Sequence, residues 1–291
     1  MAVAGDIVLQ VFITGASGRL GRILRAQWAS RVDLGFDPVW CSRHPTLNAD
    51  VYWDILSGPT PAIAKGAIIL HLAGVVRGDR AALSENAQMA TQICRAAKGA
   101  EAAHIFLPSS AAVYGAGSCD HVEVHAPDPC SDYGQAKLDM EREALIWAQN
   151  EGQGAPPITC LRIGNVLGAD SLFGQLNMGN KIVLDAIPSQ AGGPIRSYIG
   201  PRAFADTIAS LMVQAGSGAV LPPILNVASN RAVFMADLLI AAERTFSFGT
   251  PKSDAIAKVS LSTKRLEMLV PSVPVDASGM VADWQCSNMV A

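Results

Sequence analysis

One stretch near the N-terminus constrains the fold of this chain more than any other: residues 7–24, which read IVLQVFITGASGRLGRIL. The apolar and β-branched residues at 7–13 predict a buried strand. Three glycines follow, and the amphipathic run after them, which carries Ile23, Leu24 and Trp28, predicts a helix. A strand, a glycine-rich turn and a helix in this order indicate an α/β fold that holds phosphate groups at the helix N-terminus.

Each of the three glycines has a physical task in such a turn. Gly15 permits the tight turn, Gly18 lets the backbone approach a pyrophosphate, and Gly21 lets the helix pack closely against the strand. The spacing is G-x-x-G-x-x-G rather than G-x-G-x-x-G, so the usual dinucleotide fingerprint does not match as written. A glycine-rich surface turn is the alternative, and the flanking strand and helix favour a nucleotide site.

Length and composition agree with this fold and argue against several partners. The 291 residues suffice for one large α/β domain, alone or with a smaller lobe, and a half-hydrophobic composition suits a buried parallel sheet. A net charge of −3 gives no reason to expect nucleic acid or an anionic membrane surface. We expect no signal peptide, because Asp6 stands where a basic segment would, and no apolar run is long enough to span a bilayer. Six cysteines without a C-x-x-C pair indicate reduced thiols and a cytoplasmic protein.

The end of the second expected strand, residues 37–42, bears on the choice of cofactor. In dinucleotide-binding folds a carboxylate at this point hydrogen-bonds the adenosine ribose 2′-hydroxyl and repels a 2′-phosphate. Here Ser42 and Arg43 occupy that point, and His44 follows. A hydroxyl and a guanidinium can hold a phosphate with charge-assisted hydrogen bonds, so we expect NADP as the preferred cofactor and NAD as the alternative.

Further strands alternate with helical patterns along the chain. They are expected at 51–55, 67–73 and 104–108, with a helix at 86–97 before the last of them. Such alternation predicts right-handed crossovers and a doubly wound parallel sheet. Asp54 is placed to meet an adenine amino group, the small pair Ala73-Gly74 lets a dinucleotide cross a strand end, and His71 is expected to be a packed core histidine.

The candidate chemistry begins where the strand at 104–108 ends. Ser109 and Ser110 follow it, at the edge where open α/β sheets bind ligands. Tyr133 and Lys137 then open a helical pattern that runs to about residue 150, and a separation of four places them on one helical face. A neighbouring ammonium favours the phenolate and lowers the pKa of a tyrosine, which makes the phenol a usable acid or base. The serine hydroxyl would hold and polarise a substrate oxygen.

These motifs together resemble the extended short-chain dehydrogenase/reductases, the NAD-dependent epimerase/dehydratase family. The matching segments are TGASGRLG at 14–21, HLAG at 71–74, Asn86, SSAAVYG at 109–115, YGQAK at 133–137 and LRIGNVLG at 161–168, with weaker echoes in RSYIG at 196–200 and LNVAS at 225–229. The resemblance covers essentially the whole chain. It implies a Rossmann domain and an enzyme that transfers hydride at a carbon of a sugar or sugar-like substrate.

The resemblance also implies roles for particular residues. Tyr133 would be the catalytic acid/base, Lys137 its partner and Ser110 the hydroxyl that polarises the substrate. Besides Ser42 and Arg43, the expected cofactor-binding residues are Gly15, Ser17, Gly18, Arg19, Leu20, Asp54, Ile55, Leu72, Ala73, Gly74, Asn86, Tyr133, Lys137 and Ile163. The expected substrate-binding residues are Ser110, Ala111, Asn165 and Arg196.

Departures from the family pattern narrow the activity. Ala111 and Ala112 stand where dehydratases carry an Asp-Glu pair, which argues against elimination of water. The missing acidic ribose ligand favours net reduction with NADPH, whereas SSAAVYG followed by YGQAK is much like the nucleotide-sugar epimerases. An NAD-dependent nucleotide-sugar epimerase is therefore the alternative, and a dinucleotide-sensing protein without catalysis is a further one.

The remaining expectations concern organisation and partners. We expect a dinucleotide-binding domain at 1–168, to which 201–229 returns, and a small substrate lobe at 169–200 and 230–291. The cysteines and histidines between residues 119 and 130 fit no ordinary zinc spacing, so no metal is expected. The family resemblance implies a homodimer formed through the helices near 84–98 and 133–150.

Overall fold

The computed structural model describes residues 8–29, 31–44, 49–174, 181–270 and 275–288. A seven-stranded sheet forms its centre, with the strand order β10-β6-β5-β4-β1-β2-β3. Every pairing in it is parallel. The strands are β1 (Gln10–Thr14), β2 (Asp37–Ser42), β3 (Val51–Tyr52), β4 (Ile68–His71), β5 (His104–Ser110), β6 (Ile158–Ile163) and β10 (Ile224–Val227). The chain runs outward from β1 to β3 and then resumes at β4 on the other side of β1, so the strand order reverses between β1 and β4.

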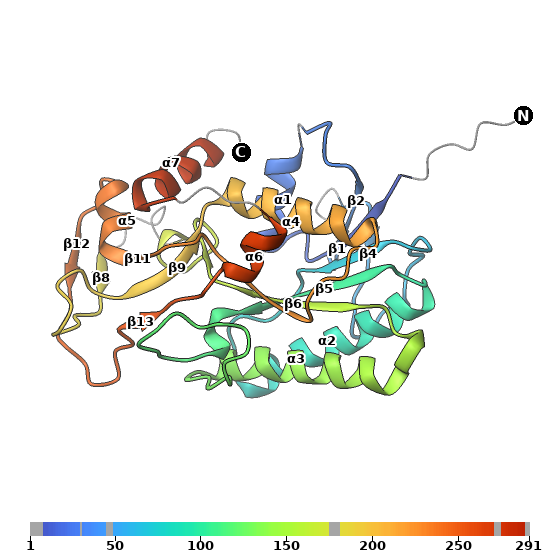
Figure 1. The fold of residues 1–291 in the computed structure, drawn as a ribbon, viewed down its shortest axis with the longest axis horizontal. Coiled ribbons are helices and arrows are strands. Elements are labelled where there is room, and N and C mark those ends of the chain that lie inside the picture. The colour runs from blue at the N-terminus through green and yellow to red at the C-terminus, as the bar shows by residue number, and fades with distance from the viewer. Residues whose placement is uncertain (1–7, 30, 45–48, 175–180, 271–274, 289–291) are drawn as a thin grey trace, which may run out of the picture.

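Helices cover both faces of this sheet. In Figure 1, α2 (Arg80–Gly99) and α3 (Asp132–Glu151) lie side by side below it, whereas α1 (Arg19–Trp28), α4 (Pro201–Gly216) and the short α6 (Lys264–Leu269) lie above it. Each face has its own apolar core because β1, β4 and β5 are apolar on both sides. The predicted doubly wound α/β fold is thus confirmed.

A smaller body adjoins the carboxyl ends of the strands, at the left of Figure 1. Its sheet contains β7 (Asn165–Val166), β9 (Ile195–Ile199), β11 (Ala232–Phe234) and β13 (Lys258–Val259), and β8 (Ile182–Leu184) pairs with β12 (Phe246–Phe248). Two helices, α5 (Met235–Ala241) and α7 (Ala277–Asn288), pack on it. Phe173 and Trp284, with ring centroids 5.0 Å apart, lie in its apolar core.

The elements differ from the sequence expectations mainly at their ends. Strand β1 continues to Thr14, and residue 7 of the expected strand lies outside the described residues. Strand β3 has two residues rather than the expected five, because a turn begins at Ile55 and the backbone leaves the sheet before it. The division into domain and lobe stays a prediction, and α6, from the segment assigned to the lobe, packs on the core of the main sheet. Within the described ranges, none of the helices has the length and apolar character needed to cross a membrane.

Candidate functional site

The glycine-rich turn brings the backbone of β1 against the end of β4. Gly15 has φ +71°, and a Cβ built on it would lie 2.4 Å from the amide nitrogen of Ala73. A Cβ on Gly21 would lie 2.4 Å from the Gly15 carbonyl oxygen. Gly18 is the N-cap of α1 and provides no side-chain cap, so the first N–H groups of the helix point toward the turn without a side-chain partner. This is the arrangement that receives a pyrophosphate.

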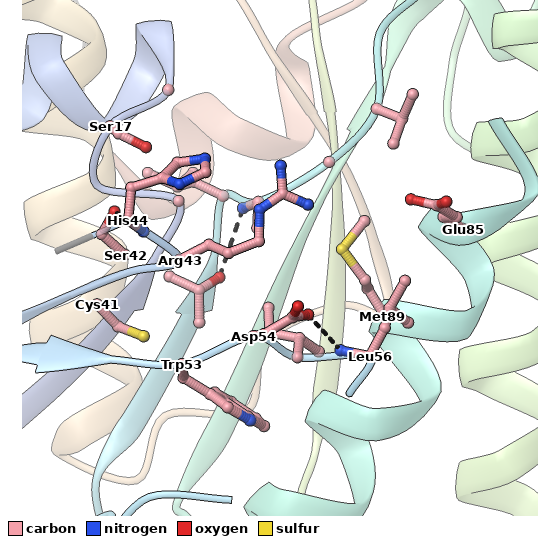
Figure 2. Close-up of a pocket in the computed structure, with 18 residues that line it drawn as sticks. Ser17, Cys41, Ser42, Arg43, His44, Trp53, Asp54, Leu56, Glu85 and Met89 are labelled. Atoms are coloured by element: carbon pink, nitrogen blue, oxygen red, sulfur yellow. Dashed lines mark hydrogen bonds between the residues drawn. The ribbon is translucent and has the colours of Figure 1, made fainter. Parts of the chain in front are cut away.

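A cavity of about 200 Å³ opens beside this turn, between the ends of β1, β2 and β4 (Figure 2). It lies where the strand order reverses, which is the usual ligand site of doubly wound sheets. The predicted cofactor residues that line it are Gly15, Ser17, Gly18, Ser42, Arg43, Asp54, Ile55, Leu72, Ala73 and Gly74. An elongated phosphate-containing ligand fits this donor set, because the backbone of the glycine-rich turn and the side chains of Arg43 and His44 all line the cavity (Figure 2).

The residues after β2 are arranged so that positive charge faces the cavity. The Ser42 hydroxyl accepts a hydrogen bond from the backbone N–H of His44 at 3.2 Å, which fixes the turn that carries Arg43. Asp54 lies across the cavity, where its Oδ1 accepts from the Leu56 N–H at 3.2 Å. A hydrogen bond from Ser57 and, more weakly, the charge of Arg43 lower the pKa of Asp54.

Six predicted cofactor residues do not line this cavity: Arg19, Leu20 and Asn86, and also Tyr133, Lys137 and Ile163, which are described below. The Arg19 guanidinium donates to the carbonyl oxygen of Ala169 at 2.9 Å and so points toward the segment that enters the smaller body. Leu20, beside it, packs against the apolar core above the sheet. The Asn86 amide is occupied by the backbone of Val75, from which it accepts at 3.1 Å and to which it donates at 2.9 Å. Arg19, Leu20 and Asn86 therefore shape the site rather than line it.

The predicted catalytic side chains come together at the end of β5. Lys137 is buried, and its Nζ donates to the carbonyl oxygen of Pro108 at 2.9 Å. A Cβ built on Gly74 would lie 3.5 Å from this Nζ, so Lys137 reaches the edge of the dinucleotide cavity. Tyr133 lies one turn earlier on α3 and hydrogen-bonds Ser110. The structure thus brings Ser110, Tyr133 and Lys137 into one cluster.

The electrostatics of this cluster differ from the simple sequence argument. Burial raises the pKa of Tyr133, and the hydrogen bond with Ser110 opposes that rise. The expected lowering by Lys137 is not seen, because its ammonium is directed at the Pro108 carbonyl. Burial lowers the pKa of Lys137 to about 8. Next to it, burial lowers the pKa of His71 to about 3, and this histidine is the packed core residue expected, hydrogen-bonded to Thr14 Oγ1 at 2.7 Å.

A second cavity of about 220 Å³ lies on the other side of Ser110. The predicted residues Ser110, Ala111, Ile163, Asn165 and Arg196 line it, and Ile163 therefore belongs to this cavity rather than to the first. Ser110 lines this second cavity, and Lys137 reaches Gly74 at the edge of the first, so the cluster of Ser110, Tyr133 and Lys137 connects the two cavities.

Arg196 gives the second cavity its positive charge. Its guanidinium is held by backbone carbonyl oxygens, those of Ile195 at 2.8 Å and Ile256 at 2.9 Å. Burial lowers its pKa, whereas Tyr198 and Asp185 raise it from a distance. A guanidinium held by neutral oxygens keeps its full charge for an anionic ligand.

Several lining residues were missed by the sequence argument. On α2, Glu85 and Met89 line the first cavity. They are four residues apart and so share one face of the helix that follows the Ala73-Gly74 turn, which was a usable signal. Cys130 and Ser131 line the second cavity just before Tyr133. Ile256 and Val259 line it from the segment around β13, about 120 residues later, and no local pattern announces that contact.

The cysteine- and histidine-rich loop before Tyr133 is bound to the smaller body. Asp120 accepts a hydrogen bond from the Ser260 hydroxyl at 2.6 Å and pairs with Lys258 at 3.1 Å. The His121 ring stacks on Tyr114, with ring centroids 4.7 Å apart. Among the residues that the structure describes, no three His, Cys, Asp or Glu side chains gather as metal ligands would.

Comparisons with known proteins agree with this geometry. The model of the NAD dependent epimerase/dehydratase family matches residues 11–191, more than half of the chain. No curated protein sequence matches at a significant level.

Among solved structures, MoeE5 in complex with UDP-glucose and NAD has a TM-score of 0.75 at 19% identity, covering 96% of this chain and 99% of that one. The UDP-glucose 4-epimerase of Thermus thermophilus in complex with NAD has a TM-score of 0.72 at 18% identity, covering 96% and 99%. TunA, an NAD dependent NDP-hexosamine 5,6-dehydratase, has a TM-score of 0.73 at 17% identity, covering 95% and 97%. At such identities the likeness shows the fold alone.

Proposed function

The chain belongs to the NAD-dependent epimerase/dehydratase family of enzymes, and we propose that it transfers hydride between a nicotinamide dinucleotide and a hydroxyl or carbonyl carbon of a nucleotide-sugar. The observation that carries the proposal is the place of Ser110, Tyr133 and Lys137 between two cavities. Lys137 reaches the edge of the cavity beside the glycine-rich turn, and Ser110 lines the cavity that contains Arg196.

In this proposal the three side chains handle the proton and the substrate oxygen. The bound nicotinamide would supply or accept the hydride. Tyr133 gives its phenolic proton to the substrate oxygen during reduction and takes that proton during oxidation. The Ser110 hydroxyl donates a hydrogen bond to the same oxygen and polarises the carbon–oxygen bond. The Lys137 ammonium, which donates to the Pro108 carbonyl, would favour the phenolate form of Tyr133 once it turns from that carbonyl toward the phenol.

The cofactor is a nicotinamide dinucleotide, and we propose NADP rather than NAD. The 2′-position of an adenosine ribose falls at the end of β2 in this fold, where Ser42, Arg43 and His44 offer a hydroxyl, a guanidinium and an imidazole. A 2′-phosphate would gain charge-assisted hydrogen bonds there. The neighbouring structures that contain NAD make NAD the alternative.

The substrate proposal rests on the charge of the second cavity. A nucleotide-sugar carries an anionic diphosphate, and Arg196 is a guanidinium held by carbonyl oxygens. Asn165 lines the same cavity and offers an amide to a sugar or phosphate oxygen. The UDP-glucose named for MoeE5 has this chemistry.

Two other activities and the oligomeric state belong with this proposal. An epimerase would use the same three side chains and return the hydride to the opposite face of the sugar. A dinucleotide sensor that does no catalysis does not need Tyr133 placed against Ser110.

The proposal also includes a homodimer that forms through the outer face of α2 and α3. Ile146 on α3 supports it, because this apolar side chain is 55% exposed. Sedimentation velocity tests the oligomeric state.

The test is Tyr133→Phe in the purified enzyme with UDP-glucose, whose hydroxyl carbon gives up the hydride, and either NADP+ or NAD+, which accepts it. Turnover, followed at the nicotinamide absorbance and by NMR of the sugar, should fall by at least about a hundredfold. Cofactor binding, followed by fluorescence titration, should stay within about twofold of wild type because the phenol is not needed to hold the dinucleotide. Undiminished turnover in Tyr133→Phe contradicts the proposal. Tightly retained NAD in the isolated protein would favour the epimerase.

A further inference from the structure

A buried ion pair joins the helix that carries Tyr133 and Lys137 to the main sheet. Glu141 lies on α3 one turn after Lys137, and Arg162 lies on β6 opposite Ser109 of β5. The contact has two prongs: Arg162 Nε donates to Glu141 Oε1 at 3.0 Å, and Nη2 donates to Oε2 at 2.7 Å. The two side chains are only 5% and 3% exposed. The pair therefore fixes α3 against the strand next to the one that carries Ser110.

Stability alone does not account for this pair. Removing two charges from water costs about as much as their attraction returns, so a pair of apolar side chains would dock the helix equally well. One guanidinium nitrogen, Arg162 Nη1, is buried without a hydrogen-bond partner, which adds to that cost. The guanidinium is partly compensated by the Tyr114 ring, whose centroid lies 4.6 Å from its Cζ. Because burying the Glu141–Arg162 ion pair costs free energy that an apolar pair would not, we infer that its charges have a role in the catalytic cluster.

The negative charge of Glu141 acts on Lys137. Burial lowers the pKa of Lys137, while Cys160 and Glu141 raise it. Burial in turn raises the pKa of Cys160 well above its ordinary value, so this thiol is uncharged near neutral pH. Lys137 itself donates to the neutral carbonyl of Pro108. Because that thiol is uncharged, the Glu141 carboxylate, paired with Arg162, is the group that opposes the loss of the Lys137 proton.

We propose that Glu141 is a positioning residue whose carboxylate, held by Arg162, docks α3 on β6 and keeps the Lys137 ammonium protonated next to Tyr133. The inference rests on the proposed function, in which that ammonium favours the Tyr133 phenolate. Without the carboxylate, Lys137 loses its proton at lower pH, and a neutral amine no longer stabilises a phenolate. Glu141 therefore acts through Lys137 and does not touch a ligand.

Two variants separate the electrostatic role from simple docking. Glu141→Gln removes the negative charge but leaves Arg162 buried and unpaired, which can prevent folding. The double variant Glu141→Gln/Arg162→Gln removes both charges and keeps two side chains of similar shape. Glu143→Gln is the matched control, since it removes the same charge from the exposed face of the same helix.

The first readout is the titration of Lys137 in protein without cofactor, by NMR of [ε-13C]lysine with the signal assigned through its loss in Lys137→Met. The double variant should titrate about half a pH unit below wild type, because the loss of the Arg162 charge offsets part of the loss of the Glu141 charge, and Glu143→Gln should titrate with wild type. The alkaline limb of the pH dependence of kcat should move downward by the same amount.

A role in docking alone gives a different result. The double variant, with no unpaired charge, would then titrate like wild type and keep the wild-type pH dependence, which would overturn the inference. Failure of the proposed function shows elsewhere, as undiminished turnover in Tyr133→Phe, and the NMR titration does not depend on turnover.

Discussion

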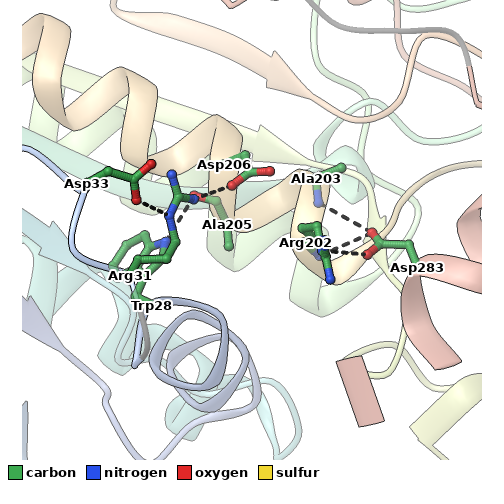
Figure 3. A network of polar contacts seen from close by, with 8 residues as sticks. All are labelled: Trp28, Arg31, Asp33, Arg202, Ala203, Ala205, Asp206 and Asp283. Atoms are coloured by element: carbon green, nitrogen blue, oxygen red, sulfur yellow. Dashed lines mark hydrogen bonds and ion pairs between the residues drawn. The ribbon is translucent and has the colours of Figure 1, made fainter. Parts of the chain in front are cut away.

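Gly200 and Asp283 lie so close together that a Cβ built on Gly200 would sit 2.1 Å from Oδ2 of Asp283. This oxygen accepts hydrogen bonds from the backbone N–H groups of Arg202 at 3.1 Å and Ala203 at 3.4 Å (Figure 3). Both belong to the first turn of α4, whose N-cap is Gly200 and which has no side-chain cap of its own. A carboxylate from α7 therefore caps a helix about 80 residues earlier and ties the end of the chain to the layer above the sheet.

We expect Gly200→Ala to lower the free energy of unfolding by about 1–2 kcal/mol, because the new methyl group displaces the Asp283 carboxylate and leaves α4 uncapped. Asp283→Ala removes the same cap, so the effects of the two substitutions should not add. Urea denaturation of both single variants and the double variant measures this. Asp254→Asn, which changes an exposed carboxylate elsewhere in the smaller body, is the control. Fully additive losses would rule out a shared cap.

Asp170 should make stability depend on pH in an unusual direction. Burial raises its pKa from 3.8 to about 6, although the N–H groups of Leu172 and Phe173 and the Tyr198 hydroxyl all donate to it. An acid whose pKa is higher in the folded than in the unfolded protein stabilises the fold below about pH 4 and loses that contribution as the pH rises through about 6. Two pKa units correspond to at most about 3 kcal/mol, and less where water reaches the side chain.

The comparison with Asp170→Asn isolates this effect. The amide keeps the shape and does not titrate, so the free energy of unfolding of wild type minus that of the variant should decrease between pH 4 and pH 6. Urea denaturation at four or five pH values in this window gives the difference. A constant difference would mean that Asp170 titrates alike in the folded and unfolded protein.

Much of the fold could be predicted because its signals are local. The buried strand, the three glycines and the helix after them are consecutive, and Gly15 needs its positive φ whatever the rest of the chain does. Tyr133 and Lys137 share a face because they are four apart on one helix. The first cavity is lined mainly by residues at the carboxyl ends of strands, and the ends of strands can be located from the sequence.

What could not be predicted depends on contacts between distant segments. Arg19 follows the glycine-rich turn directly, yet its guanidinium turns to the carbonyl of Ala169, 150 residues later. The pKa of Tyr133 depends on its burial and on Ser110, and not on its spacing from Lys137. Ile256 and Val259 reach the second cavity only because β13 pairs with β9. Residue spacing along the chain cannot predict these contacts, because each joins segments that are far apart in the sequence.

Arg196 should govern substrate affinity. Arg196→Met removes the charge that the Ile195 and Ile256 carbonyls hold in the second cavity, so we expect KM for UDP-glucose to rise about tenfold or more. The value of kcat should change less, because the guanidinium binds a group remote from the reacting carbon. Steady-state kinetics measures both values, and Arg231→Met, at an exposed arginine of the same lobe, is the control. An equal fall in kcat with unchanged KM would place Arg196 at the reacting carbon instead.

Arg43 should decide between the two nicotinamide cofactors. We expect Arg43→Ser to weaken NADPH binding by about tenfold to a hundredfold, since a charge-assisted hydrogen bond to a phosphate contributes about 1.5–3 kcal/mol. Binding of NADH should change by less than about twofold, because a 2′-hydroxyl gains little from a guanidinium. Fluorescence titration with each cofactor gives both constants.

A second substitution tests the same site from the other direction. Arg43→Asp places a carboxylate where it can accept a hydrogen bond from the 2′-hydroxyl and repel the 2′-phosphate, so the preference should reverse toward NADH. Arg77→Ser, at an exposed arginine outside the residues that line the cavity, controls for the loss of positive charge. Raising the salt concentration should weaken NADPH binding to wild type more than to Arg43→Ser, because screening acts on the charge that the variant lacks. If Arg43→Ser weakens the binding of NADPH and NADH equally, the arginine maintains the shape of the cavity and does not bind a 2′-phosphate. NAD would then be the expected cofactor.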